Sequence, residues 1–138
     1  MTVCPFCAII EGSAPSWIIH RTDQVICFLP RKCEVYGHTI IATIEHVQDI
    51  YTAGDQHLAA VMDAVKMLAE HYKVKVGATG INLLHASGDA AQQSVLHFHV
   101  HLIPRFTNDR INAWPAFDRP DIDNDQLLAK LIIRKSDD

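Results

Sequence analysis

The chain has 138 residues, of which 49% are hydrophobic and 20% are charged, and its formal net charge is −4. These values indicate one globular domain with a sizeable core, and the lack of a basic stripe argues against a surface for duplex nucleic acid. No apolar run approaches the ~20 residues of a membrane span, and the N-terminus does not read as a secretory signal. We therefore expect a cytoplasmic protein whose four cysteines are thiols or metal ligands rather than disulfides.

The N-terminal segment carries Cys4 and Cys7 at the spacing of a zinc knuckle, in which one turn supplies two thiolates. The pair could also be a redox couple or two buried thiols, although it lacks the strand-to-helix context of a thioredoxin-like motif. The residues after Cys7 are compatible with a short helical turn that Gly12 ends.

Three short strands are predicted next, at residues 17–21, 25–29 and 38–44, because these stretches are rich in apolar and β-branched residues. A loop of about three residues, 22–24, joins the first two as a hairpin. The connection from residue 30 to residue 37 is polar and precedes the third strand.

A long helix is predicted downstream, because apolar residues recur at the i, i+3, i+4, i+7 spacing of one helical face. These residues are Leu58, Val61, Met62, Val65, Leu68, Ala69 and Tyr72. Thr52 with Asp55 three residues later resembles a capping arrangement at the start of the helix. Lysines near its end suit the negative pole of the helix dipole, and Gly77 can end the helix.

A fourth strand at residues 81–85 and a loop of small residues, 86–93, lead to three histidines that alternate with apolar residues. Successive side chains of a strand point to opposite faces, so His97, His99 and His101 would line one face of a strand. On a helix the same spacing would spread the rings through about 200° of arc. Three imidazoles on one strand face indicate a functional site, although histidines satisfied by water or backbone, or a metal-binding face, would give the same pattern.

Pro104 is expected to end this strand, since proline has no N–H to donate to a neighbouring strand. The tail has a second apolar periodicity, which predicts a C-terminal helix around residues 127–132. Consecutive strands with one helical crossover favour an α+β fold, in which helices pack on a mostly antiparallel sheet of about five strands. We expect a single domain, residues 1–138, with a core at about 4–105 and a tail at 106–138 that holds the C-terminal helix.

With these residues identified, the sequence resembles the histidine triad (HIT) superfamily of nucleotide hydrolases and transferases. The resemblance rests on the stretch His97–Ile103, the preceding Gln93-Ser94-Val95, the upstream Gly37-His38-Thr39 and His46. It runs in the same order from about Cys4 to Arg105, and the layout is similar to the bacterial branch related to the Hint phosphoramidases. It implies a homodimer whose two sheets join into one, with one nucleotide site per subunit.

The resemblance implies that His99, the middle histidine, is the nucleophile. A neutral imidazole can attack phosphorus and hold the nucleotidyl group covalently, which divides one difficult displacement into two easier ones. His101 would contact the phosphate or the leaving group, and His38 would pack near the nucleophile. Gln93 and Ser94 match positions that touch the phosphate and the leaving atom, although the Ser94 hydroxyl could equally bond to the backbone at the strand entry.

The resemblance also implies that His46 and His97 complete a zinc site with Cys4 and Cys7. Two thiolates and two imidazoles close a tetrahedral structural site, whereas a catalytic zinc would keep a water. Free thiols at positions 4 and 7 are the alternative. Four further histidines are interpreted as surface or scaffold residues: His20, His57, His71 and His85.

Two stretches depart from the pattern of the superfamily. Pro30 occupies the position where many members have an aspartate that accepts both ribose hydroxyls, and Ala86 stands where an asparagine usually approaches the phosphate. Loss of the ribose acceptor should weaken discrimination for ribonucleosides. Base contacts would come from apolar residues near the first strands, although packing alone explains these equally well: Ile10, Ile18 and Phe28.

Two functions therefore remain open. The first is a hydrolase that cleaves nucleoside phosphoramidates or related nucleotidyl conjugates, with dinucleoside polyphosphates included, through a nucleotidyl-His99 intermediate; a nucleotidyl transferase is a variant of it. The second is a nucleotide-binding scaffold or regulatory protein with little turnover. The complete set of histidines favours catalysis, and the changes at Pro30 and Ala86 favour binding alone. In either case we expect a small-molecule nucleotide ligand and a second copy of the chain as partners, without a nucleic acid duplex or a membrane.

Overall fold

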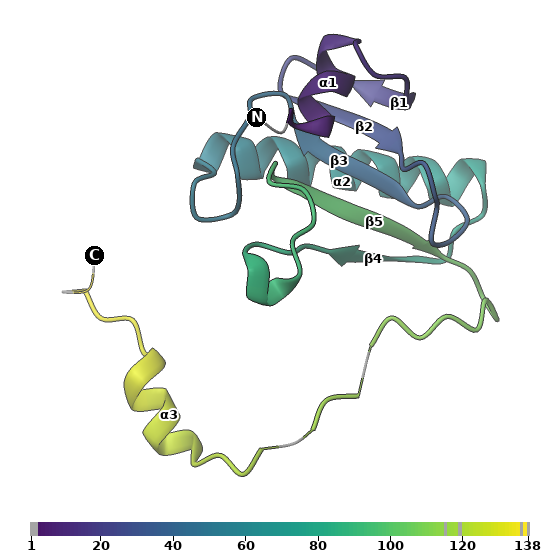
Figure 1. Cartoon of the computed structure of the whole chain (residues 1–138). Helices are drawn as coiled ribbons and strands as arrows, with labels where there is room; N and C mark the ends of the chain where they lie inside the picture. Colours follow the sequence, from purple (N-terminus) through teal and green to yellow (C-terminus); the bar gives the residue numbers. More distant parts are fainter. Residues whose placement is uncertain (1–2, 115, 119, 136, 138) are drawn as a thin grey trace.

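The fold is known from a computed structural model that describes residues 3–114, 116–118, 120–135 and 137. Its elements in chain order are α1 (Pro5–Glu11), β1 (Trp17–Arg21), β2 (Val25–Leu29), β3 (Thr39–Thr43), α2 (Asp55–Lys75), β4 (Gly80–Leu84), the short 3₁₀ helix η1 (Asp89–Ala91), β5 (His99–Arg105) and α3 (Asn124–Leu131). The strands form one antiparallel sheet in the order β1-β2-β3-β5-β4, with α2 along one face and α1 on the other (Figure 1). The α+β fold with a five-stranded antiparallel sheet, a long helix and a C-terminal helix is confirmed.

The strands alternate their side chains between two apolar layers, as a pleated sheet requires. One layer lies between the sheet and α2, and includes Val25, Cys27, Ile41, Val61, Val65, Leu68, Phe98, Val100 and Leu102. The other lies beneath α1, and includes Phe6, Ile26, Phe28, Ile40 and Ala42. The strands β2 and β3 are therefore covered on both faces, which explains why almost every residue of these two strands is buried.

The expectation that Pro104 ends the histidine strand is wrong, because β5 continues through Pro104 to Arg105. Leu102 is the last residue of β5 with a partner on β3, whereas pairing with β4 continues to Arg105. The Arg105 carbonyl accepts a hydrogen bond from the Thr79 N–H on the β4 side, so the backbone of its neighbour Pro104 faces the other side. Pro104 thus sits beyond the end of β3, where the missing N–H breaks no hydrogen bond of the sheet.

The start of α2 also differs from the predicted capping arrangement. Gly54 is the N-cap residue, and its N–H donates to Nδ1 of His57 at 2.9 Å. Thr52 instead closes a turn in which its hydroxyl and N–H both bond to Asp49. The helix ends as expected, with Gly77 in the left-handed region (φ +74°) just after Val76, a conformation that costs glycine little.

The chain after β5 leaves the domain. Arg105 binds the Asp109 carboxylate through two hydrogen bonds of 2.9 and 2.8 Å, which holds the first turn of the tail. The tail then extends away from the sheet, and every residue of α3 is exposed (Figure 1). Within the described part of the chain, no helix is long and apolar enough to cross a membrane.

Candidate functional site

His99 lies near the start of β5 with its ring held in one orientation. Its Nδ1 is 2.6 Å from the His97 carbonyl oxygen, and a carbonyl can only accept, so Nδ1 carries the proton. The lone pair of the neutral ring is therefore on Nε2. Burial is the main cause that lowers the pKa of His99, which keeps the ring neutral at pH 7. The phenyl ring of Phe6 packs edge-on against the imidazole, with ring centroids 4.9 Å apart.

His101 receives its orientation from His38 through a chain of hydrogen bonds. The Glu34 N–H donates to His38 Nδ1 at 3.2 Å, so the proton of the neutral His38 ring is on Nε2. This Nε2–H donates to His101 Nδ1 at 2.8 Å, which leaves His101 with its own proton on Nε2. Burial lowers the pKa of both rings, so each is neutral at pH 7. The Nε2–H of His101 is thus available as a hydrogen-bond donor, two residues along β5 from His99, whose Nε2 carries the lone pair.

A cavity of about 490 Å³ lies beside these rings, a size typical of small-molecule sites. His99, His101 and Ser94 line one part of it, and apolar residues of α1, β2 and β3 line much of the rest. These apolar residues include Phe6, Ile9, Phe28, Leu29 and Ile40. The cavity therefore places a potential nucleophile and two further polar side chains beside an apolar chamber, which suits a ligand with a polar reacting group and an apolar ring.

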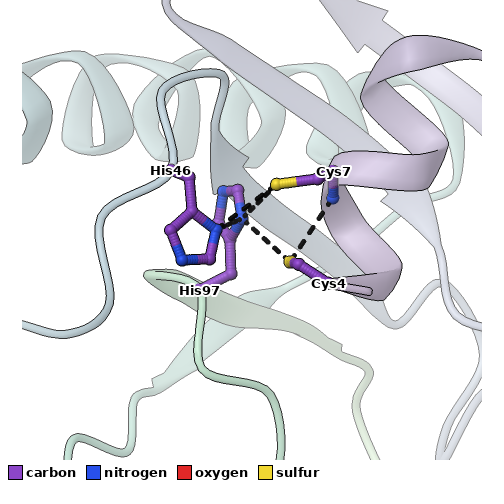
Figure 2. A group of neighbouring side chains, drawn as sticks. All are labelled: Cys4, Cys7, His46 and His97. Atoms are coloured by element: carbon purple, nitrogen blue, oxygen red, sulfur yellow. Dashed lines mark hydrogen bonds between the residues drawn. The ribbon is translucent and has the colours of Figure 1, made fainter. Parts of the chain in front are cut away.

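His97 lies in a bend two residues before β5, not in the strand as expected; it is absent from the cavity lining, and its ring faces the two N-terminal cysteines (Figure 2). Its Nε2 donates to the Thr43 carbonyl at 2.7 Å, so Nδ1 is free to accept and faces the sulfur atoms. This Nδ1 lies 3.4 Å from Cys4 Sγ, 3.7 Å from Cys7 Sγ and 3.2 Å from His46 Nδ1. All four donor atoms lie within 4.8 Å of one another. The structure thus brings together the four predicted metal ligands.

The spacing of these donor atoms fits a tetrahedral ion. Bonds of about 2.3 Å to sulfur and about 2.0–2.1 Å to nitrogen would separate neighbouring ligand atoms by roughly 3.3–3.8 Å. The distances involving His97 fall close to this range, and His46 Nδ1 lies 3.3 Å from Cys7 Sγ. Burial, with Cys4 alongside, raises the pKa of the Cys7 thiol to about 11. A divalent cation would reverse this effect, because it stabilises the thiolate, and its binding would release protons.

Of the other residues predicted to bind the nucleotide, some line the cavity and others do not. Ser94 and Phe28 line the cavity. Ile18 lies opposite Phe28 on β1, but its side chain is half exposed and outside the cavity lining. Gln93 is buried and braces the loop: its amide nitrogen donates to the carbonyls of Gln48 and Val95, and its oxygen accepts from the Gly88 N–H. Gln93 therefore shapes the entrance to the histidine strand through backbone contacts.

Sequence reasoning missed the role of His85, which follows β4. Its Nδ1–H donates to the His99 carbonyl oxygen at 2.7 Å, and its ring lies against Phe98 with centroids 4.9 Å apart. Its Nε2 pairs with the Ser87 hydroxyl at 2.6 Å, and that oxygen accepts the Ile50 N–H. Through Ser87, His85 thereby joins the connection between β3 and α2 to the backbone of the candidate nucleophile. The signal in the sequence was a polar residue at the end of a strand, which is too common to be informative.

His57 has a comparable second role at the start of α2. While its Nδ1 accepts the Gly54 N–H, its Nε2–H donates to the Glu45 carboxylate at 2.9 Å. Glu45 precedes His46, so this contact fixes the loop that presents a candidate metal ligand to the cluster. Both His57 and His85 agree with the predicted scaffold role in kind, and the structure adds what each of them holds.

Comparison with known proteins reveals consistent similarity. The family model described as the HIT domain matches residues 11–108. "Protein hit" of Bacillus subtilis is 33% identical over 103 residues, which cover 75% of this chain and 71% of that protein. "Adenylylsulfatase HINT3" of Arabidopsis thaliana is 28% identical over 129 residues, 94% of this chain and 66% of that protein. The crystal structure of a Zn-bound histidine triad family protein from Mycobacterium smegmatis superimposes with a TM-score of 0.76 at 28% identity, covering 84% of each chain.

The hydrogen bonds of His85 can be tested by substitution with phenylalanine. We expect His85→Phe to keep the ring against Phe98 but to leave the His99 carbonyl without this donor, at a cost of about 1–3 kcal/mol in the free energy of unfolding. Urea unfolding followed by circular dichroism measures this change. His71→Phe, at an exposed position on α2, is the matched control and should change stability by less than about 0.5 kcal/mol. Equal stability of the two variants would contradict the assigned role.

Proposed function

The chain belongs to the HIT domain family, a superfamily of nucleotide-binding hydrolases and transferases, and from this premise we propose that it hydrolyses nucleotidyl conjugates through His99. Nucleoside phosphoramidates and related conjugates, including dinucleoside polyphosphates, are the proposed substrates. The observation that carries the proposal is the hydrogen bond from His99 Nδ1 to the His97 carbonyl, 2.6 Å long, in a ring that also lines the cavity. This hydrogen bond leaves His99 Nε2 unprotonated, so its lone pair is available to attack phosphorus.

In the first step, the His99 Nε2 lone pair forms a bond to the phosphorus atom as the bond from phosphorus to the leaving nitrogen or oxygen breaks, and the leaving atom takes up a proton from water. The His101 Nε2–H, oriented by His38, donates a hydrogen bond to a phosphoryl oxygen or to the leaving atom. Ser94 lies in the same lining and supplies a hydroxyl near the leaving group. In the second step, water attacks the nucleotidyl-His99 phosphorus, the P–N bond returns its electrons to Nε2, a nucleoside monophosphate is released, and the proton of the attacking water passes to solvent.

The apolar part of the cavity is proposed to hold the base. Phe28 is almost completely buried and contributes to the wall shared by β2 and α1, whereas Ile18, its partner on β1, lies outside the cavity lining. Gln93 would act through the loop whose backbone it holds near the phosphate. The alternative, a nucleotide-binding protein with little turnover, is favoured by Pro30 and Ala86, neither of which offers a polar side chain to the ligand.

Replacement of the nucleophile tests the catalytic proposal. His99→Ala should reduce hydrolysis of an adenosine 5′-phosphoramidate by at least about a thousandfold, because the covalent route is lost. Mass spectrometry of acid-quenched wild-type protein should detect a nucleotidyl adduct that maps to His99. His20→Ala, on the exposed strand β1, is the control and should keep its activity. Near wild-type turnover by a folded His99→Ala protein would rule out covalent catalysis at this residue.

We also propose that Cys4, Cys7, His46 and His97 hold a structural zinc ion. The support is the donor set, its near-tetrahedral spacing and the engagement of His97 Nε2 by the Thr43 carbonyl, which is typical of a metal-binding histidine. Cys4 is the N-cap residue of α1 and Cys7 lies within that helix, whereas His46 lies in the loop after β3 and His97 lies two residues before β5 (Figure 2). Zinc would therefore supply a cross-link between segments that are distant in the sequence.

Metal analysis tests this site. Elemental analysis of protein purified without chelator should find about one zinc per chain, and chelation should lower the melting temperature, because metal binding contributes to folding free energy. The double substitution Cys4→Ser and Cys7→Ser should lower the melting temperature similarly, whereas Cys33→Ser, at an exposed loop position, should not. If the purified protein contains no metal and chelator leaves its stability unchanged, Cys4 and Cys7 are ordinary thiols and the proposal is wrong.

A homodimer is the third proposal. The strand β4 forms one edge of the sheet, so its outer backbone groups are available to a second strand, and Leu83 and Leu84 are exposed there. The tail after β5 carries further exposed apolar side chains, among them Trp114 and Phe117. A second copy would cover both the edge and part of this apolar surface.

Light scattering measures the assembly. At micromolar concentration we expect a mass of about twice the 15.4 kDa of one chain. Leu84→Lys should shift the mass toward that of the monomer, because it places a charge at the free edge. Val74→Lys changes an equally apolar residue that is 81% exposed on α2, and should leave the mass unchanged. A monomeric wild-type protein would contradict the proposal.

A further inference from the structure

The cavity beside His99 has an outer end with a distinct composition. Pro15, Ser16, Trp17 and Arg31 line the main cavity and also line a second hollow of about 400 Å³. Trp17 is the first residue of β1 and pairs with Leu29, the last residue of β2, and Arg31 lies two residues beyond Leu29. Because the same four residues border both spaces, the hollow is continuous with the proposed nucleotide site.

The polar groups of this outer end are predominantly hydrogen-bond donors. The Arg31 guanidinium offers five N–H groups, the Trp17 indole offers one, and the Ser16 hydroxyl offers one that can rotate. Among the described residues, no carboxylate lines either space, and Arg31 forms no ion pair. A cation with two neutral donors, in a lining that holds no carboxylate, is suited to an anionic ligand, and phosphate oxygens match the planar fork of arginine.

Pro30, the residue before Arg31, indicates which part of the nucleotide would contact this subsite. Pro30 lines the same cavity and has no side-chain acceptor, so it cannot accept hydrogen bonds from the two hydroxyls of an unmodified ribose. In dinucleotide-binding proteins, a carboxylate accepts the ribose hydroxyl, whereas an arginine accommodates a phosphate on that hydroxyl. The same contrast in chemistry applies here, where a proline and an arginine stand together on the wall of the cavity.

We propose that Arg31, with Ser16 and Trp17, binds a phosphate ester on the ribose, so that the preferred substrates are nucleotidyl conjugates with a 2′- or 3′-phosphorylated ribose. The inference rests on the proposed function, because it assigns the reacting 5′-phosphorus to His99. It deepens that function by naming the substrate class. Arg31 then acts as a specificity-determining residue in the wall of the cavity that His99 also lines.

Binding of stable nucleotides tests the subsite without turnover. Isothermal titration calorimetry of the full chain would compare adenosine 5′-monophosphate with adenosine 2′,5′-bisphosphate, adenosine 3′,5′-bisphosphate and adenosine 5′-diphosphate. We expect one ribose-phosphorylated nucleotide to bind at least about tenfold more tightly than the monophosphate, as a charge-assisted contact would provide. Arg31→Gln should bring this ratio close to one, and Arg31→Lys should retain part of it. Lys32→Gln, which changes a neighbouring cation outside both cavity linings, should keep the wild-type ratio.

The outcomes separate the inference from the function on which it rests. The two bisphosphates distinguish a 2′-phosphate from a 3′-phosphate. Equal affinity for the monophosphate and both bisphosphates would overturn the subsite while the proposed hydrolase stands. A gain seen only with the 5′-diphosphate would also overturn it, because the additional charge would then bind near the reacting phosphate. Absence of binding by all four nucleotides, together with absence of a His99 adduct, would overturn both.

Discussion

The place of β5 in the interior of the sheet determines where both candidate sites form. Paired with β3 on one side and β4 on the other, β5 cannot shift its register without moving its apolar side chains out of the layer under α2. The alternation of side chains along the strand directs His99 and His101 toward the cavity, and His97, which lies in a bend two residues before the strand, faces the cysteines. Packing on one face of the strand thus fixes the chemistry on the other.

The helix α1 belongs to both sites. Its N-terminal end presents Cys4 and Cys7 to the metal cluster, while Phe6 contacts His99 and forms part of the cavity wall. Gly12, in the left-handed conformation at φ +81°, ends the helix after only two turns and returns the chain to β1. Any change that moves α1 therefore alters the wall of the cavity as well as the spacing of the thiols.

The sequence was sufficient to predict the sheet, the long helix and the four residues of the cluster, because these follow from side-chain periodicity and from a resemblance that extends over most of the chain. It did not predict that Pro104 lies inside β5, since this depends on where β3 ends. It also did not predict the contacts of His85 and His57, whose partners are the His99 carbonyl and Glu45. The tautomers of His38 and His101 depend on the Glu34 N–H, a backbone group whose direction has no signature in the sequence.

The cluster of Figure 2 joins Cys4 to His97 across 93 residues of chain. During synthesis at ~5–20 residues per second, the two thiols leave the ribosome roughly 5–20 s before the histidine that completes their site. They spend this interval on a nascent chain whose sheet still lacks its fifth strand. A disulfide formed between them in those seconds would have to be reduced before the four donor atoms could come together.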